Sequence, residues 1–118
     1  MMNTLTVLIL VLSLCCTGQR MESIPSSSVV KNPGETLSLS CRGSGFTFTD
    51  YAMAWIRQPT GKRLEWLGLG YSSQSSNIYA SSVRGQIEIS REDSNSITHL
   101  RLSNLKSEDS AVYYCAAQ

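Results

Sequence analysis

Short stretches in which apolar and polar residues alternate recur along the chain from residue 36 onward. In 36–42, Leu37, Leu39 and Cys41 share one face, while serines occupy the other. A period of two is typical of half-buried strands. The other stretches of this kind are 53–58, 64–69, 86–90, 97–102 and 111–116. We therefore predict an all-β sandwich or barrel of short strands, with one helical turn at 106–109.

The two cysteines of this alternating region, Cys41 and Cys115, both fall on the apolar phase of their strands. Trp55 is also in the inward phase, and Tyr113 lies two residues before Cys115. An inward cysteine pair, a tryptophan packed on its disulfide and a tyrosine corner are features of the immunoglobulin sandwich. These core residues favour that fold over the alternative, a generic sandwich with a chance tryptophan.

Residues 1–18 have a different character, because Leu5–Leu14 is apolar apart from two hydroxyl residues. This run is too short to span a bilayer, which needs about 20 residues, and it fits a secretory signal peptide. The small residues Cys16 and Gly18 suit a peptidase site, so we expect cleavage after Gly18 and a mature domain over 19–118. No basic residue precedes the run, and an uncleaved anchor is the alternative.

Cleavage would remove Cys15 and Cys16 and leave Cys41 and Cys115 as the mature cysteines. Two cysteines in an oxidising compartment most often form one disulfide. The mature sequence has no second apolar segment that could anchor it in a membrane. The chain is thus expected to be secreted or extracellular.

Composition argues against several other classes of function. A length of 118 residues allows one domain, and a net charge of +1 gives no support for a nucleic-acid or polybasic membrane binder. The single histidine, His99, has no serine or acidic residue arranged around it in the sequence. There is no glycine-rich phosphate loop, and a zinc site is not expected from one histidine and two paired cysteines. We therefore expect no enzyme activity, no cofactor and no metal.

The stretch 55–68, Trp-Ile-Arg-Gln-Pro-Thr-Gly-Lys-Arg-Leu-Glu-Trp-Leu-Gly, resembles the second framework of immunoglobulin heavy-chain variable domains. The segments 33–35, 44–46, 90–91 and 107–116 are similar to other heavy-chain framework regions. This resemblance covers 19–118 and implies a V-type antiparallel β-sandwich. Light chains and T-cell receptor chains usually have other residues after the tryptophan. The alternative is a V-type domain of a T-cell or innate immune receptor.

The resemblance implies antigen recognition by loops at one end of the sandwich, in adaptive humoral immunity. The first loop would be 45–52, the second 70–77, and the third would begin after Cys115. The second loop is rich in tyrosine, serine, glycine and asparagine, which suits binding, although a plain solvated loop has a similar composition. The residues expected to contact antigen are Asp50, Tyr51, Tyr71 and Gln74.

A second surface is expected to pair with an immunoglobulin light-chain variable domain. In the family, the positions matching Ile56, Gln58, Leu64, Trp66 and Tyr114 form this interface, and apolar groups turned away from a core usually mark one. Paired in this way, the chain would be secreted or would sit on the cell surface within a membrane-bound immunoglobulin. Arg63 departs from the usual glycine and places a charge near the interface rim.

Three further departures from the family affect stability. Gln86 stands where the family has an arginine, so Asp109 is expected to lose its usual ion partner and to accept a hydrogen bond from Gln86 instead. Thr98 stands where leucine is usual and is expected to shrink the core locally. The sequence ends three residues after Cys115, so the third loop and final strand are missing. We expect an unpaired edge near Ala116 and a poorly stable isolated chain.

Overall fold

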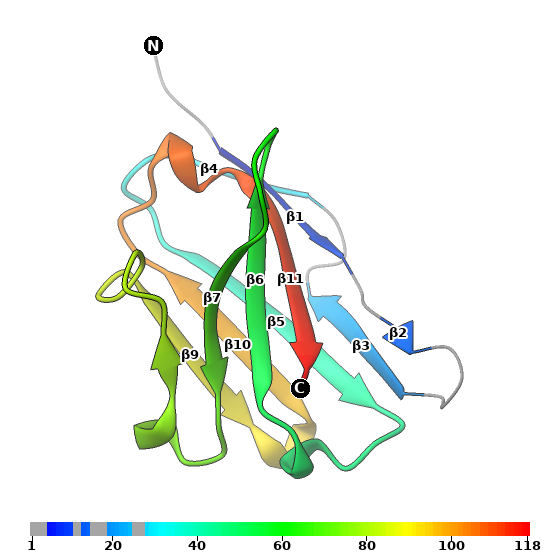
Figure 1. The fold of residues 1–118 in the computed structure, drawn as a ribbon. Coiled ribbons are helices and arrows are strands. Elements are labelled where there is room, and N and C mark those ends of the chain that lie inside the picture. The colour runs from blue at the N-terminus through cyan, green and yellow to red at the C-terminus, as the bar shows by residue number, and fades with distance from the viewer. Residues whose placement is uncertain (1–4, 11–12, 15–18, 25–27) are drawn as a thin grey trace.

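A computed structural model describes residues 5–10, 13–14, 19–24 and 28–118, and two β-sheets packed face to face make up the fold (Figure 1). In the six-stranded sheet the order is β4 (Val29–Lys31), β1 (Leu5–Leu10), β11 (Ala111–Ala117), β6 (Met53–Pro59), β7 (Glu65–Gly70) and β8 (Ile78–Tyr79). In the five-stranded sheet it is β2 (Ser13–Leu14), β3 (Gln19–Ile24), β5 (Leu37–Ser44), β10 (Ile97–Leu102) and β9 (Ile87–Glu92). The predicted all-β V-type sandwich is confirmed.

Six strands, β5, β6, β7, β9, β10 and β11, form where the alternation of the sequence predicts them, whereas the remaining strands were not predicted. In β5, side chains alternate between buried and more exposed along the strand, so Leu37, Leu39 and Cys41 face the core. The predicted turn at 106–109 is the 3-10 helix η4 (Ser107–Asp109). Three further 3-10 turns occur in the connections, namely η1 (Phe48–Asp50), η2 (Gln74–Ser76) and η3 (Asp93–Asn95).

A disulfide between Cys41 on β5 and Cys115 on β11 joins the two sheets. Trp55 and Tyr113 are both 0% exposed, as the sequence predicts for core residues. Trp55 lies on β6 directly beside Cys115 in the strand register. The sequence separation of 74 between the cysteines closes a long loop, and the loop-entropy model assigns such a link about 4 kcal/mol.

Thr98 is fully buried next to Trp55 and has a role that its size alone did not suggest. The indole Nε1 of Trp55 donates a hydrogen bond of 3.1 Å to the Thr98 hydroxyl, which donates to the Ser90 carbonyl at 3.3 Å. A buried indole N–H that lacks an acceptor is costly. The Thr98 hydroxyl therefore accepts the hydrogen bond of the Trp55 indole N–H, which a leucine side chain could not do.

We predict that Thr98→Val lowers the free energy of unfolding by about 1–3 kcal/mol, because the Trp55 N–H loses its acceptor in the core. Thermal and denaturant unfolding of the full chain would measure this change. Thr98→Ser, which keeps the hydroxyl, is the control and should retain most of the stability. A valine variant as stable as the parent would contradict the assigned role.

The first half of β11 pairs with an N-terminal strand in the chain that retains residues 1–18. Strand β1 runs parallel to β11, from the pair Val7 and Ala111 to the pair Leu10 and Tyr114, and antiparallel to β4 on its other side. This pairing covers residues 111–114 of β11 and does not reach Ala116. The expectation of an unpaired edge near Ala116 concerns the chain without residues 1–18, and it stays a prediction. An open strand edge offers unpaired backbone groups to any extended segment within reach.

Removal of residues 1–18 remains a prediction, as does the domain boundary at 19. No helix among the described residues is both long and apolar enough to cross a membrane.

We predict that a chain starting at Gln19 is less stable and aggregates more readily than the chain that retains residues 1–18. It would lack the strand that pairs with both β4 and β11, so two sheet edges would open. Thermal melts and light scattering of both chains would test this. A cooperative melt at an unchanged midpoint for the shorter chain would show that β1 contributes nothing.

Candidate functional site

Two loops meet at one end of the sandwich, the lower end in Figure 1. The first connects β5 to β6 through η1, and the second connects β7 to β8 through η2. A cavity of about 630 Å³ lies between them, and it includes Gln118, whose backbone exchanges hydrogen bonds with Ala52. Hydroxyl groups dominate the lining, from Thr49, Ser72, Ser73 and Ser76 and from two tyrosines. The end of the sandwich therefore offers a shallow, polar and partly aromatic concavity.

Three of the four residues predicted to contact antigen line this cavity. Asp50 is exposed, while Tyr51 and Tyr71 are half-buried. The fourth residue, Gln74, is exposed in η2 but is not among the lining residues. The structure thus brings Asp50, Tyr51 and Tyr71 together and leaves Gln74 outside.

Arg91, at the end of β9, holds both loops from beneath. Its side chain is only 4% exposed. Its guanidinium donates hydrogen bonds of 2.9 Å to the carbonyls of Phe48 and Tyr51 in the first loop, and to that of Gly70 at the start of the second. It also lies 4.6 Å from the centroid of the Phe48 ring, a cation–π distance. One buried cation therefore sets the relative position of the two loops.

The carboxylate of Asp93 balances this cation. Arg91 Nε donates to Asp93 Oδ1 at 2.6 Å. Burial opposes ionisation of Asp93, but hydrogen bonds from Arg91 and Ser72 outweigh it and lower the pKa of its carboxyl. Because Ser72 belongs to the second loop, the Arg91–Asp93 pair is tied to that loop by a side chain as well. In the sequence, residues 90–91 stand out only as part of a framework motif. The role of Arg91 in holding the loops is not visible there, because three of its acceptors are backbone carbonyls.

Asn77 closes the base of the second loop. Its Oδ1 accepts a hydrogen bond from the Tyr71 backbone N–H at 2.7 Å, and its Nδ2 donates to the Ile89 carbonyl at 2.8 Å. Gly70 precedes this loop, and a Cβ there would lie 2.5 Å from Ile89 Cγ2. The close approach of β7 to β9 therefore requires glycine at this position.

We predict that Arg91→Lys loosens both loops, because an ammonium cannot replace the planar fork that reaches carbonyls of separate segments. Hydrogen exchange of the amides in 47–52 and 70–77 should rise, and the melting temperature should fall. The control is Arg42→Lys, an exposed arginine on β5, which should change neither. Unchanged exchange in Arg91→Lys would contradict the assigned role.

The five residues predicted at the pairing surface lie on β6, β11 and the β7 side of the hairpin. Four of them, Ile56, Gln58, Leu64 and Tyr114, line a shallow pocket of about 350 Å³. Leu64 is 62% exposed and Trp66, opposite Ile56 in the register, is 39% exposed. Large apolar side chains open to solvent on one sheet face form a patch suited to a partner. We call these five residues the pairing face.

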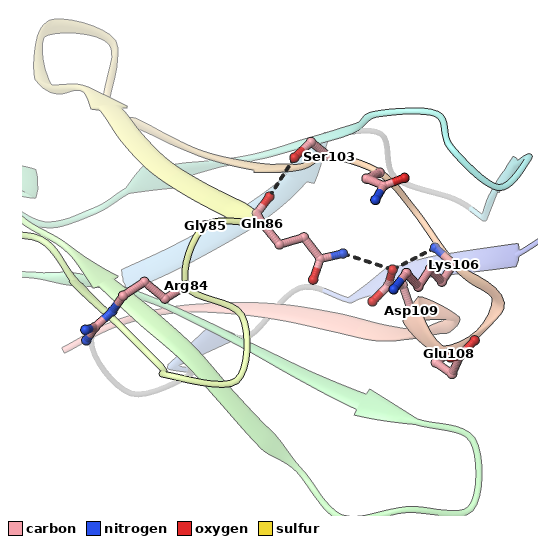
Figure 2. A pocket seen from close by; sticks show the side chains of 8 residues that line it. Arg84, Gly85, Gln86, Ser103, Lys106, Glu108 and Asp109 are labelled. Atoms are coloured by element: carbon pink, nitrogen blue, oxygen red, sulfur yellow. Dashed lines mark hydrogen bonds between the residues drawn. The ribbon is translucent and has the colours of Figure 1, made fainter.

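At the opposite end of the sandwich, Asp109 is buried and fully engaged (Figure 2). Its Oδ2 accepts from Gln86 Nε2 at 3.1 Å and from the Lys106 backbone N–H at 2.9 Å. Its Oδ1 accepts from Arg57 Nη1 at 3.0 Å. The expected Gln86 hydrogen bond is confirmed. The expected loss of an ion partner is only partly right, because the buried Arg57 supplies one from β6.

The same arginine links the Asp109 carboxylate to the core tyrosine. Arg57 Nε donates to Glu65 Oε1 at 2.8 Å, and Tyr113 donates its hydroxyl to the Asp109 carbonyl at 2.7 Å, as a tyrosine corner does. Burial raises the pKa of Tyr113 to about 12. Burial also disfavours the charged forms of Arg57 and Glu65, but their mutual hydrogen bond raises the pKa of the guanidinium and lowers that of the carboxyl.

A cavity of about 410 Å³ lies beside Asp109, whose side chain takes part in holding this end of the sandwich together. Arg84 and Glu108 both line it, yet their side chains point away from its centre in Figure 2. The Asp109 oxygens at its floor are taken by protein groups.

His99 has neighbours that its place in the sequence did not reveal. Its Nδ1 forms a hydrogen bond of 2.7 Å with the Ser40 hydroxyl, and its Nε2 one of 2.5 Å with Glu92 Oε2. The sequence shows no serine–aspartate arrangement around His99, and it is the register of β5, β10 and β9 that brings Ser40 and Glu92 to it. Hydrogen bonds from His99 and then Asn95 lower the pKa of the Glu92 carboxyl.

This serine–histidine–glutamate cluster spans neighbouring strands of the five-stranded sheet. It lies half-exposed on a strand ladder, and the cavities described above are lined by other residues. No group of three or more histidine, cysteine or acidic residues suited to a metal occurs in the part of the chain that the structure describes.

Together, the bridged sheets, the tyrosine corner and the paired loops at one end define a V-type immunoglobulin sandwich. Residues 24–118 match the family model of the immunoglobulin V-set domain. The chain belongs to the immunoglobulin V-set family. This is a non-enzymatic family whose domains are typically extracellular or on the cell surface and commonly bind ligands or partner domains.

Proposed function

We propose that the chain recognises antigen as the variable region of an immunoglobulin heavy chain, in adaptive humoral immunity. The observation that carries this proposal is the combination of two surfaces on one domain. The cavity between the loops has a lining rich in hydroxyl and tyrosine groups, and tyrosine and serine suit adaptable recognition. The pairing face offers exposed leucine and tryptophan side chains to a second domain.

Antigen contact is assigned to Asp50, Tyr51 and Tyr71, which line the loop cavity, and to Gln74, which lies in η2 of the second loop. The carboxylate and phenols would give directional contacts, while Arg91 beneath keeps both loops in place before any ligand arrives. Such preorganisation lowers the entropy lost on binding. The chemistry of this site is binding alone, so no proton or group transfer is involved.

The pairing face is assigned to a light-chain variable domain. Ile56, Leu64 and Trp66 would bury apolar area, and Tyr114 and Gln58 would add polar contacts at their edges. A leader at 1–18 would deliver the chain to the secretory pathway, where it would be secreted or displayed on the cell surface within an immunoglobulin. These assignments agree with the heavy-chain pattern of 55–68.

The test is co-secretion of the full chain with a panel of light-chain variable domains. We expect a heterodimer, and we expect Leu64→Asp to weaken it by about tenfold or more, because a carboxylate would be buried without a partner. Val30→Asp is the matched control, since Val30 is 63% exposed on β4, outside the pairing face. Failure to pair with any light-chain domain would contradict the proposal and favour a T-cell or innate V-type receptor.

The gene offers an independent check. A recombination signal directly after the codon for Gln118 would support an antibody segment. A splice site leading into an exon for a membrane segment would favour an innate receptor instead.

A further inference from the structure

The turn between β6 and β7 places two cations at the border of the pairing face. Lys62 and Arg63 are both exposed and directly precede Leu64, whose side chain lines the pairing pocket. Gln58, another lining residue, donates its amide to the Lys62 carbonyl at 3.1 Å. The turn is also closed by a hydrogen bond of 3.0 Å from the Lys62 N–H to the Pro59 carbonyl. These bonds hold the backbone of the turn, which carries the two cationic side chains, next to the pairing face.

Among the described residues, no carboxylate forms an ion pair with Arg63. The adjacent acidic residue, Glu65, is engaged by Arg57 at 2.8 Å and by the Ser82 hydroxyl at 3.1 Å. Among the ion pairs formed by the described residues, none includes Lys62 or Arg63. The rim of the pairing face thus carries an excess of positive charge beside exposed apolar surface.

We propose that this rim selects a partner V-type domain that carries a carboxylate where its surface meets Arg63. The inference rests on the proposed pairing and adds a rule for which partners are chosen. Complementary rim charges guide encounter and suppress wrong partners more than they add affinity. An uncompensated arginine would attract an acidic rim and repel a basic one.

The same charge disfavours a second copy of this chain as the occupant. In a symmetric dimer both rims would bring the same Lys62 and Arg63, and Glu65, the acidic residue two positions after Arg63, is already held by Arg57. Like charges without counter-charges cost association free energy. The rim therefore favours heterologous pairing over self-association.

The experiment selects partners for two versions of the full chain. A displayed light-chain variable domain is randomised among Glu, Gln and Lys at the positions that border its pairing surface. It is then selected on the parent chain and on Arg63→Glu. We expect carboxylates to be enriched by the parent and lysine by Arg63→Glu at one shared position. Exchanging the charge at this position should change the association rate about two- to fivefold, in keeping with an exposed ion pair.

Arg42→Glu is the control, since it makes the same charge change on β5 of the other sheet and should select as the parent does. The rate advantage of the carboxylate partner should shrink at high salt. Identical selected residues for the parent and for Arg63→Glu would overturn the inference while leaving the pairing intact. If neither version selects any light-chain domain, the proposed pairing itself fails, and the inference fails with it.

Discussion

The bond between Cys41 and Cys115 sets the spacing on which the rest of the domain depends. It joins β5 to β11, which are interior strands of opposite sheets, at a Cα separation of 6.6 Å. Trp55 packs in the same region and needs the Thr98 hydroxyl to satisfy its indole N–H. The centre of the core therefore combines one covalent link, one large aromatic ring and one buried hydrogen bond. Changes in any of them would shift the sheets on which both binding surfaces are built.

Two buried arginines hold the segments at the two ends of the sandwich in place. At one end, Arg57 donates hydrogen bonds to Glu65, Asp109 and Tyr113. At the other end, Arg91 donates hydrogen bonds to the two loops and to Asp93. A buried charge is tolerated only when its hydrogen-bonding groups find partners. Each guanidinium therefore fixes the segments around it. The positions of the loop cavity and of the β6–β7 turn are both consequences of this requirement.

The two proposed binding surfaces are built on the same two strands. Strands β6 and β11 carry Ile56, Gln58 and Tyr114 of the pairing face, and the same strands lead to Ala52 and Gln118 at the loop cavity. A partner domain seated on the pairing face would thus stand beside the recognition loops. Among the described residues of the other sheet, the His99 cluster is engaged by interactions between neighbouring strands.

Much of this architecture was predictable because alternation is a local property of the sequence. Side-chain type and a period of two were enough to place Cys41, Trp55, Tyr113 and Cys115 in the core. The same periodicity turned Ile56 and Tyr114 outward. The resemblance of 55–68 to a heavy-chain framework then assigned these outward positions a partner, which remains a proposal.

Other features depended on tertiary structure alone. The carbonyls that Arg91 binds belong to the backbone and carry no residue identity that a sequence could reveal. Ser40 and His99 lie 59 residues apart and meet only through strand register. The pairing of β1 with β11 likewise follows from an open sheet edge, not from the apolar character of residues 5–10. The sequence by itself determined which side chains face the core. Tertiary packing decided which distant groups meet, because those contacts depend on how strands align in space.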